Sequence, residues 1–131
     1  MAKIVFCEDS PIIQKLIGLA LRSTPHEIHI AADGAEGLAL IERERPDVVF
    51  TDVSMPNVDG FQLADALKAR PDLAHIPIII MTASGDQEQL DEGWRHGAAG
   101  HFAKPFAAAA LRAKVDELAA DVGASRRGPG S

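Results

Sequence analysis

The sequence predicts one α/β domain built on a five-stranded parallel sheet, with helices wound on both of its faces. Five short apolar runs alternate with five amphipathic segments along the chain, and this pattern is typical of successive strand–helix units. Right-handed crossovers between parallel strands place the helices on both faces of the sheet. The chain has 131 residues, of which 47% are hydrophobic and 24% charged. This length accommodates one hydrophobic core but not two.

The first strand–helix unit and the second strand have clear boundaries. Residues 3–7 are an apolar run that predicts a buried strand. Ser10 and Pro11 mark a helix start, because a hydroxyl N-cap precedes a proline at the first helical position. Residues 27–31 alternate apolar and polar side chains, which favours an edge strand. A turn at residues 33–34 leads into the second helix.

The middle of the chain continues the alternation. The second helix ends near residue 45, and residues 47–52 predict a strand that is buried on both faces. A loop follows, and a third helix is expected over residues 59–70. Residues 76–82 are the most hydrophobic predicted strand.

The last two units complete the domain. A helix is expected over residues 87–96, a short strand over residues 101–103, and an alanine-rich helix from residue 107. We expect the domain to occupy residues 1–122. Residues 123–131 are predicted to be a flexible tail because of their Gly, Pro, Ser and Arg content.

The composition excludes several classes of protein. A net charge of −6 argues against general affinity for nucleic acid or anionic lipid. No apolar run approaches the ~20 residues that span a bilayer, and the start of the chain lacks a signal-peptide layout. Cys7 is the single cysteine, which excludes an internal disulfide framework and fits a reducing compartment. We therefore expect a cytoplasmic protein without membrane insertion.

Reactive side chains follow four of the five predicted strands. The first strand ends in Glu8 and Asp9, the third in Asp52, the fourth in Thr82 and the fifth in Lys104. Ligands of open parallel sheets bind beyond these carboxyl ends. Three crowded carboxylates repel one another, and Mg²⁺, which takes oxygen ligands, removes that conflict. The set predicts phosphoryl transfer to Asp52, with Thr82 and Lys104 contacting the anion.

These motifs resemble those of response regulator receiver domains of two-component signal transduction. The matching stretches are Glu8–Asp9, residues 52–60, Thr82–Ala83 and residues 104–106. The resemblance extends over roughly residues 3–122. It implies a flavodoxin-like sheet in the strand order 2-1-3-4-5.

The resemblance also implies the role of each acidic residue. Asp52 is similar to the family's phosphoacceptor. Asp9 and Asp52 match the metal-binding carboxylates, and the backbone carbonyl of Ser54 is the third expected protein ligand of Mg²⁺. Glu8 matches the residue that holds a metal-bound water.

The switch residues follow the family only in part. Thr82 matches the hydroxyl that moves toward the phosphoryl group, and Lys104 matches its ion-pair partner, with a cis bond expected before Pro105. The family usually has Tyr or Phe three residues before that lysine, but His101 stands here. We therefore expect His101 to be an exposed residue on the partner surface.

The expected function is that of a phosphorylated signalling switch. A histidine kinase or phosphotransfer protein would donate a phosphoryl group to Asp52 in the presence of Mg²⁺. The domain would catalyse only its own phosphorylation and dephosphorylation. An output protein or domain would contact residues 87–120, and no direct contact with nucleic acid is expected.

Two other functions remain open at this point. A flavodoxin-type cofactor binder needs a Ser-, Thr- or Gly-rich phosphate loop after the first strand, where this chain has Glu8 and Asp9. A hydrolytic phosphatase with an aspartyl nucleophile commonly has a second acid two residues later, where this chain has Ser54. Sustained turnover of a phosphate ester would favour the phosphatase.

The remaining chemically distinctive residues favour structural roles. Trp94 lies four residues after Leu90 on the same predicted helix face, so we expect core packing, with exposure at a partner surface as the alternative. The five histidines show no paired ligand spacing, so a zinc site is not expected.

Overall fold

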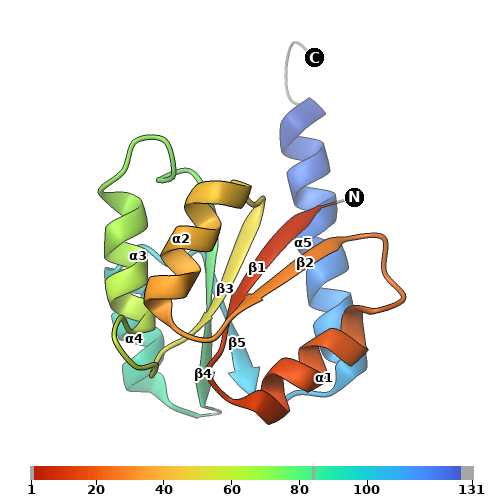
Figure 1. Ribbon diagram of the computed structural model, residues 1–131, viewed down its shortest axis with the longest axis horizontal. Coiled ribbons are helices and arrows are strands. Elements are labelled where there is room, and N and C mark those ends of the chain that lie inside the picture. The colour runs from red at the N-terminus through yellow and green to blue at the C-terminus, as the bar shows by residue number, and fades with distance from the viewer. Residues whose placement is uncertain (1, 84, 128–131) are drawn as a thin grey trace.

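The computed structural model describes residues 2–83 and 85–127 and, within these, the side chains up to residue 122. Its five strands form one parallel sheet in the order β2-β1-β3-β4-β5, which confirms the predicted fold (Figure 1). The strands are β1 (Lys3–Cys7), β2 (Glu27–Ala31), β3 (Val48–Asp52), β4 (Ile78–Ala83) and β5 (Gly100–Lys104). The helices are α1 (Pro11–Leu21), α2 (Gly34–Glu44), α3 (Gly60–Lys68), α4 (Gln87–Arg95) and α5 (Ala108–Arg127).

The helices form two layers around the sheet. Figure 1 shows α2, α3 and α4 on one side of the sheet and α1 and α5 on the other. Successive residues of a strand point to opposite faces, so Ile4 packs against the α1–α5 layer and Val5 against the α2–α3 layer. The central strands are therefore apolar on both faces, as parallel sheets require.

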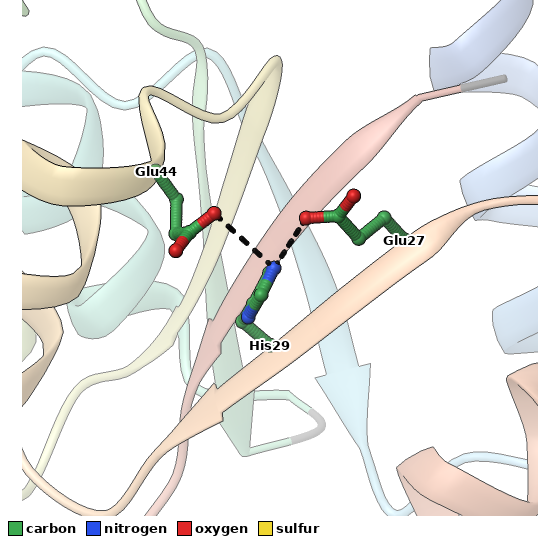
Figure 2. A group of neighbouring side chains, drawn as sticks. All are labelled: Glu27, His29 and Glu44. Carbon is green, nitrogen blue, oxygen red and sulfur yellow. Dashed lines mark hydrogen bonds and ion pairs between the residues drawn. The ribbon is translucent and has the colours of Figure 1, made fainter.

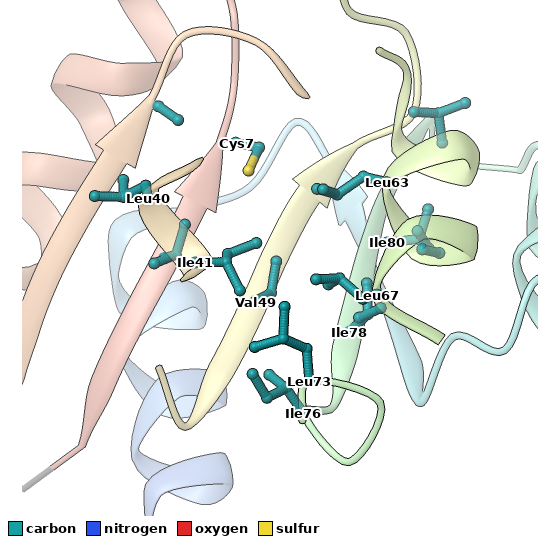
Figure 3. Close-up of a cluster of buried hydrophobic side chains, with 14 residues drawn as sticks. Cys7, Leu40, Ile41, Val49, Leu63, Leu67, Leu73, Ile76, Ile78 and Ile80 are labelled. Carbon is teal, nitrogen blue, oxygen red and sulfur yellow. The ribbon is translucent and has the colours of Figure 1, made fainter. Parts of the chain in front are cut away.

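Each layer encloses its own hydrophobic cluster. On the α1–α5 side, the rings of Phe6 and Phe50 stack with centroids 4.7 Å apart. On the other side, Leu63 and Leu67 of α3 are fully buried against Ile78 and Ile80 of β4 (Figure 3). These clusters fix the sheet and thereby the positions of its carboxyl ends.

Polar N-caps determine where four of the helices begin. Ser10, Asp33, Asp59 and Asp86 each accept a hydrogen bond from a backbone N–H three residues later. Such a bond satisfies one of the free amide groups of the first helical turn. The helix start predicted at Ser10 and Pro11 is confirmed.

The C-terminal helix extends past the expected end of the domain at residue 122. Helix α5 continues to Arg127, so the expected boundary after Val122 falls inside a helix. Residues 128–131, which belong to the expected flexible tail, lie outside the described residues. Within the described part of the chain, no helix has the length and apolar character needed to cross a membrane.

The position of Trp94 differs from the core packing that helical spacing predicted. Its side chain is 51% exposed, so the expected core packing is wrong and the alternative, an exposed position, is correct. Gly93 is the buried residue of this turn of α4. The close approach of α4 to β4 therefore takes place over a glycine, while Trp94 points to solvent.

Candidate functional site

Three carboxylates meet at the carboxyl ends of β1 and β3. Cys7 and Thr51 are partners in the parallel register of these strands, so the residues that follow them, Glu8 and Asp52, leave the sheet side by side. One ligand oxygen from each of Glu8, Asp9 and Asp52 lies within 4.8 Å of the others. The predicted acidic cluster is therefore formed.

Lys104, the last residue of β5, joins the cluster from the carboxyl end of that strand. Its Nζ donates to Asp52 Oδ2 at 2.8 Å and to Glu8 Oε2 at 3.4 Å. Partial burial lowers the pKa of Lys104, but the bond to Asp52 and the charges of Asp52 and Glu8 outweigh it, so the pKa is raised. The ammonium is therefore charged at neutral pH and is shared by two carboxylates.

Glu8 is a buried acid with an unused oxygen. The residue is fully buried, and its Oε1 has no hydrogen-bond partner among the described residues. Burial, followed by the bond to and charge of Asp52, raises its pKa to about 7, although Lys104 opposes the shift. An unsatisfied buried carboxylate oxygen costs free energy, so this side chain is poised to accept a cation or a water.

The backbone around Asp52 holds its carboxylate in place. The N–H of Val53 donates to Asp52 Oδ1 at 2.8 Å, and the Thr51 hydroxyl donates to the Asp52 carbonyl at 3.0 Å. Gly60, the first residue of α3, lies directly against that carbonyl, where a Cβ atom has no room. Close packing of α3 on the end of β3 thus fixes the Asp52 backbone, and Asp52 Oδ2 accepts a hydrogen bond from Lys104.

The other two predicted residues lie at the same edge but without a bond to this cluster. Thr82 is nearly buried at the end of β4, one residue beyond the partner of Asp52 in the register. Ser54 lies exposed in the loop after β3. Among the described contacts, neither side chain makes a hydrogen bond to Asp52 or Lys104.

His101 occupies the position at which the sequence departs from the family pattern. Its side chain is exposed on edge strand β5, as expected. The ring meets Trp94 of α4 edge-on, with centroids 6.1 Å apart. The Lys104–Pro105 bond is cis, as expected.

The residues of this edge suit a hard divalent cation. The cluster has three carboxylates but one ammonium, and the buried Glu8 Oε1 lacks a partner. Mg²⁺ prefers oxygen ligands from one or two carboxylates and completes its shell with water. The donor set fits such an ion.

Comparison with known proteins identifies the family. The family model of the response regulator receiver domain matches residues 4–116. The chain belongs to this family. Receiver domains of response regulators serve in two-component signalling, and the present domain therefore has a function of that class.

Individual relatives agree with this assignment. The receiver domain is 31% identical to the DNA-binding dual master transcriptional regulator RpaA of Synechocystis, over 90% of this chain and 49% of that protein. The solved structure of the chemotaxis protein CheY4 of Vibrio cholerae is 32% identical, with a TM-score of 0.82, over 90% of this chain and 98% of that one.

A third relative contains a metal ion. The receiver domain of a sensor histidine kinase from Pseudomonas aeruginosa, solved with magnesium coordinated in its active-site cleft, is 29% identical with a TM-score of 0.81. The match covers 94% of this chain and 98% of that one. By contrast, the chain spans about half or less of the length of several curated relatives.

Two supporting residues escaped prediction from sequence. Gln14 Nε2 donates to the Glu8 carbonyl at 2.6 Å and ties the first turn of α1 to the site. The Val53 amide holds Asp52 Oδ1. Gln14 is a polar residue on the apolar side of a helix, which is a usable signal, but a backbone donor leaves no mark in the sequence.

A second group of possible metal ligands is formed by two residues of β2 and the last residue of α2. His29 Nε2 lies 2.6 Å from Glu27 Oε2 and 3.6 Å from Glu44 Oε1 (Figure 2). Lys3 contacts both carboxylates, at 3.7 and 3.4 Å. Arg43 donates to Glu44 and lowers its pKa. Two cations thus already balance the two acids, so we assign this group as an ion-pair network.

Proposed function

We propose that the receiver domain accepts a phosphoryl group on Asp52 from a phosphohistidine of a histidine kinase or phosphotransfer protein, in the presence of Mg²⁺. The observation that carries this proposal is the arrangement of Glu8, Asp9 and Asp52 within 4.8 Å of one another beside Lys104. The site lies where open parallel sheets bind their ligands.

The transfer is a single displacement at phosphorus. A carboxylate oxygen of Asp52 forms the new P–O bond while the P–N bond to the donor histidine breaks. The electron pair of that bond returns to the imidazole nitrogen, which takes up a proton. Because Val53 N–H and Lys104 hold both Asp52 oxygens, the nucleophile is oriented before the donor arrives.

The acids of the cluster and one backbone carbonyl would hold the metal. Asp9, Asp52 and the backbone carbonyl of Ser54 are the proposed protein ligands of Mg²⁺, and Glu8 would hold a metal-bound water. When bound, Mg²⁺ neutralises charge on the phosphoryl oxygens. The magnesium in the active-site cleft of the related Pseudomonas aeruginosa receiver domain supports this assignment.

The acyl phosphate then acts on the two switch residues. The added phosphoryl oxygens compete with Asp52 and Glu8 for the Lys104 ammonium, and the Thr82 hydroxyl can donate to them. The domain catalyses its own phosphorylation and dephosphorylation in this proposal. It works in the cytoplasm, because its single, buried cysteine suits a reducing compartment.

The proposed output surface is the region over residues 87–120. The exposed Trp94 and His101 lie together on it. Trp is among the residues that contribute most to binding in interfaces, and the ring of His101 packs edge-on against Trp94. We therefore assign His101 to partner contact.

A small-molecule phosphodonor tests this function directly. The wild type, incubated with acetyl phosphate and MgCl₂, should gain one phosphoryl group by intact mass, and removal of Mg²⁺ with EDTA should prevent the gain. Asp52→Asn should gain none, whereas Asp91→Asn, a change at an exposed acid of α4, should behave as wild type. An unmodified wild type, or modification of Asp52→Asn, would refute the proposal.

A further inference from the structure

Helix α4 is anchored by very little buried side-chain surface. Gly93 is the buried residue of α4, whereas α3 buries Gly60, Leu63, Ala64 and Leu67. Segments with few buried apolar contacts open at low free-energy cost. The docking of α4 therefore depends strongly on polar contacts at its ends.

His96, the C-cap of α4, supplies such a contact to α3. Its ring stacks on Phe61, with centroids 5.1 Å apart and planes inclined by 16°. Nδ1 lies 2.7 Å from Asp65 Oδ1, and Nε2 lies 3.3 Å from Glu92 Oε1. Both ring nitrogens thus face a carboxylate, one on α3 and one on α4.

This arrangement requires the imidazolium. A neutral imidazole has one N–H donor, and its other nitrogen is an acceptor that repels a carboxylate; only the protonated ring donates on both sides. The hydrogen bond to Asp65 is the largest effect and raises the pKa of His96; burial lowers it, but the charges of Asp65 and Glu92 also raise it, so the net shift is upward.

The other charged groups around His96 leave its two carboxylates available. On α4, Arg95 donates to Glu92 Oε2 at 2.9 Å, so Glu92 Oε1 remains for the histidine. On α3, Lys68 directs its Nζ to the Ala74 carbonyl.

An acidic cavity adjoins the same contact. Asp86 and Glu88 border a cavity of about 310 Å³ together with Phe61 and Glu92. Asp86 and Glu88 lie at the N-terminal end of α4, a helix length away from His96, so the charges that act on the ring are those of Asp65 and Glu92.

We propose that His96 is a proton-dependent clip, which fastens α4 to α3 more tightly when it is protonated and less tightly when it is neutral, because the neutral ring can donate to only one of the two carboxylates. The clip lies between two functional features. Phe61 follows Gly60, which packs on Asp52, and Trp94 on the exposed face of α4 is two residues before His96. Deprotonation therefore loosens this contact and gives α4 and Trp94 greater freedom, whether or not Asp52 is phosphorylated.

The pH window follows from the direction of the shift. The pKa of His96 in the folded chain lies above its ordinary value of 6.5. The stabilisation is therefore complete below pH 6.5 and is lost as the pH rises through the folded pKa.

NMR on the intact chain tests the clip. The imidazole signals of His96 should titrate above 6.5 in the wild type, and Asp65→Asn should lower that midpoint. Amide protection factors in α4, which divide out intrinsic exchange, should be roughly two- to five-fold higher at pH 6 than at pH 8. His96→Gln should abolish this difference, and His75→Gln, at an exposed histidine in the loop before β4, should retain it.

Two results would overturn the proposal. One is a His96 midpoint at or below 6.5. The other is an equal pH dependence of α4 protection in the wild type and His96→Gln. Failure of Asp52 phosphorylation would leave both readouts unaffected, so the clip and the phosphoacceptor function are tested separately.

Discussion

Lys104 Nζ lies 2.8 Å from Asp52 Oδ2 and 3.4 Å from Glu8 Oε2. A single ammonium thus neutralises part of a three-carboxylate cluster before any cation binds. The same position makes Lys104 a competitor of the metal and a partner of an incoming phosphoryl group. Because Lys104 contacts both acids, the positive charge of Lys104 bears on the predictions made below for Mg²⁺ affinity and for the titration of Glu8.

Lys104→Met should raise Mg²⁺ affinity several-fold. The substitution removes the positive charge that repels the metal and competes for Asp52 and Glu8. Calorimetric titration with MgCl₂ at low ionic strength measures the change, and Lys15→Met, at an exposed lysine of α1, is the matched control. Equal or weaker affinity in Lys104→Met would show that the ammonium does not share its carboxylates with the metal.

Glu8→Gln should stabilise the metal-free domain at alkaline pH. The pKa of Glu8 is raised from 4.5 to about 7 in the folded chain, so its contribution to stability is complete below 4.5 and lost as the pH rises through about 7. At pH 8 the variant should therefore unfold with a free energy on the order of 2 kcal/mol higher than the wild type.

Urea unfolding in EDTA, repeated from pH 4 to pH 8, measures this difference. The two proteins should converge at pH 4, where Glu8 is protonated. Glu36→Gln, at an exposed acid of α2, provides the control. A difference between wild type and Glu8→Gln that does not change with pH would argue against a buried, titrating Glu8.

Gly60→Ala should destabilise the domain and slow phosphorylation of Asp52. The new methyl group would collide with the Asp52 carbonyl, and overpacking of this kind costs about 1–3 kcal/mol. Gly18→Ala in α1 meets no neighbouring atom and should instead add up to ~1 kcal/mol through helix propensity. Chemical denaturation compares the two; equal effects would exclude close packing of α3 on β3.

Leu67→Ala should cost about 3–5 kcal/mol because it leaves a cavity in the fully buried cluster of Figure 3. Leu19 on α1 is 51% exposed, so Leu19→Ala should have a much smaller effect. The midpoint of urea unfolding distinguishes them. A loss below 1 kcal/mol for Leu67→Ala would mean that α3 does not seal this layer.

Much of the fold follows from hydrophobic patterning. The apolar runs of β1, β3 and β4 are buried on both faces, and the alternating residues of β2 lie at the sheet edge. Local capping signals such as Ser10 are also visible in the sequence. Because the carboxyl ends of parallel strands share one edge, Asp9, Asp52 and Lys104 could be grouped from sequence alone. The strand order itself came from family resemblance.

Tertiary packing explains where the predictions were wrong. Spacing from Leu90 placed Trp94 in the core, but the contact of α4 with β4 is made through Gly93. A glycine carries no hydrophobic signal, so the orientation of α4 was not visible in the sequence. The double contact of His96 likewise depends on Asp65, 31 residues earlier in the chain.

The location of the modified carboxylate tests the central claim most directly. The domain, treated with acetyl phosphate and Mg²⁺, is reduced with borohydride, which converts an aspartyl phosphate into homoserine, and is then mapped by peptide mass spectrometry. The account predicts homoserine at position 52 in the wild type and none when Mg²⁺ is omitted. Modification at Glu8 or Asp9, or no reduced carboxylate in the presence of Mg²⁺, would contradict it.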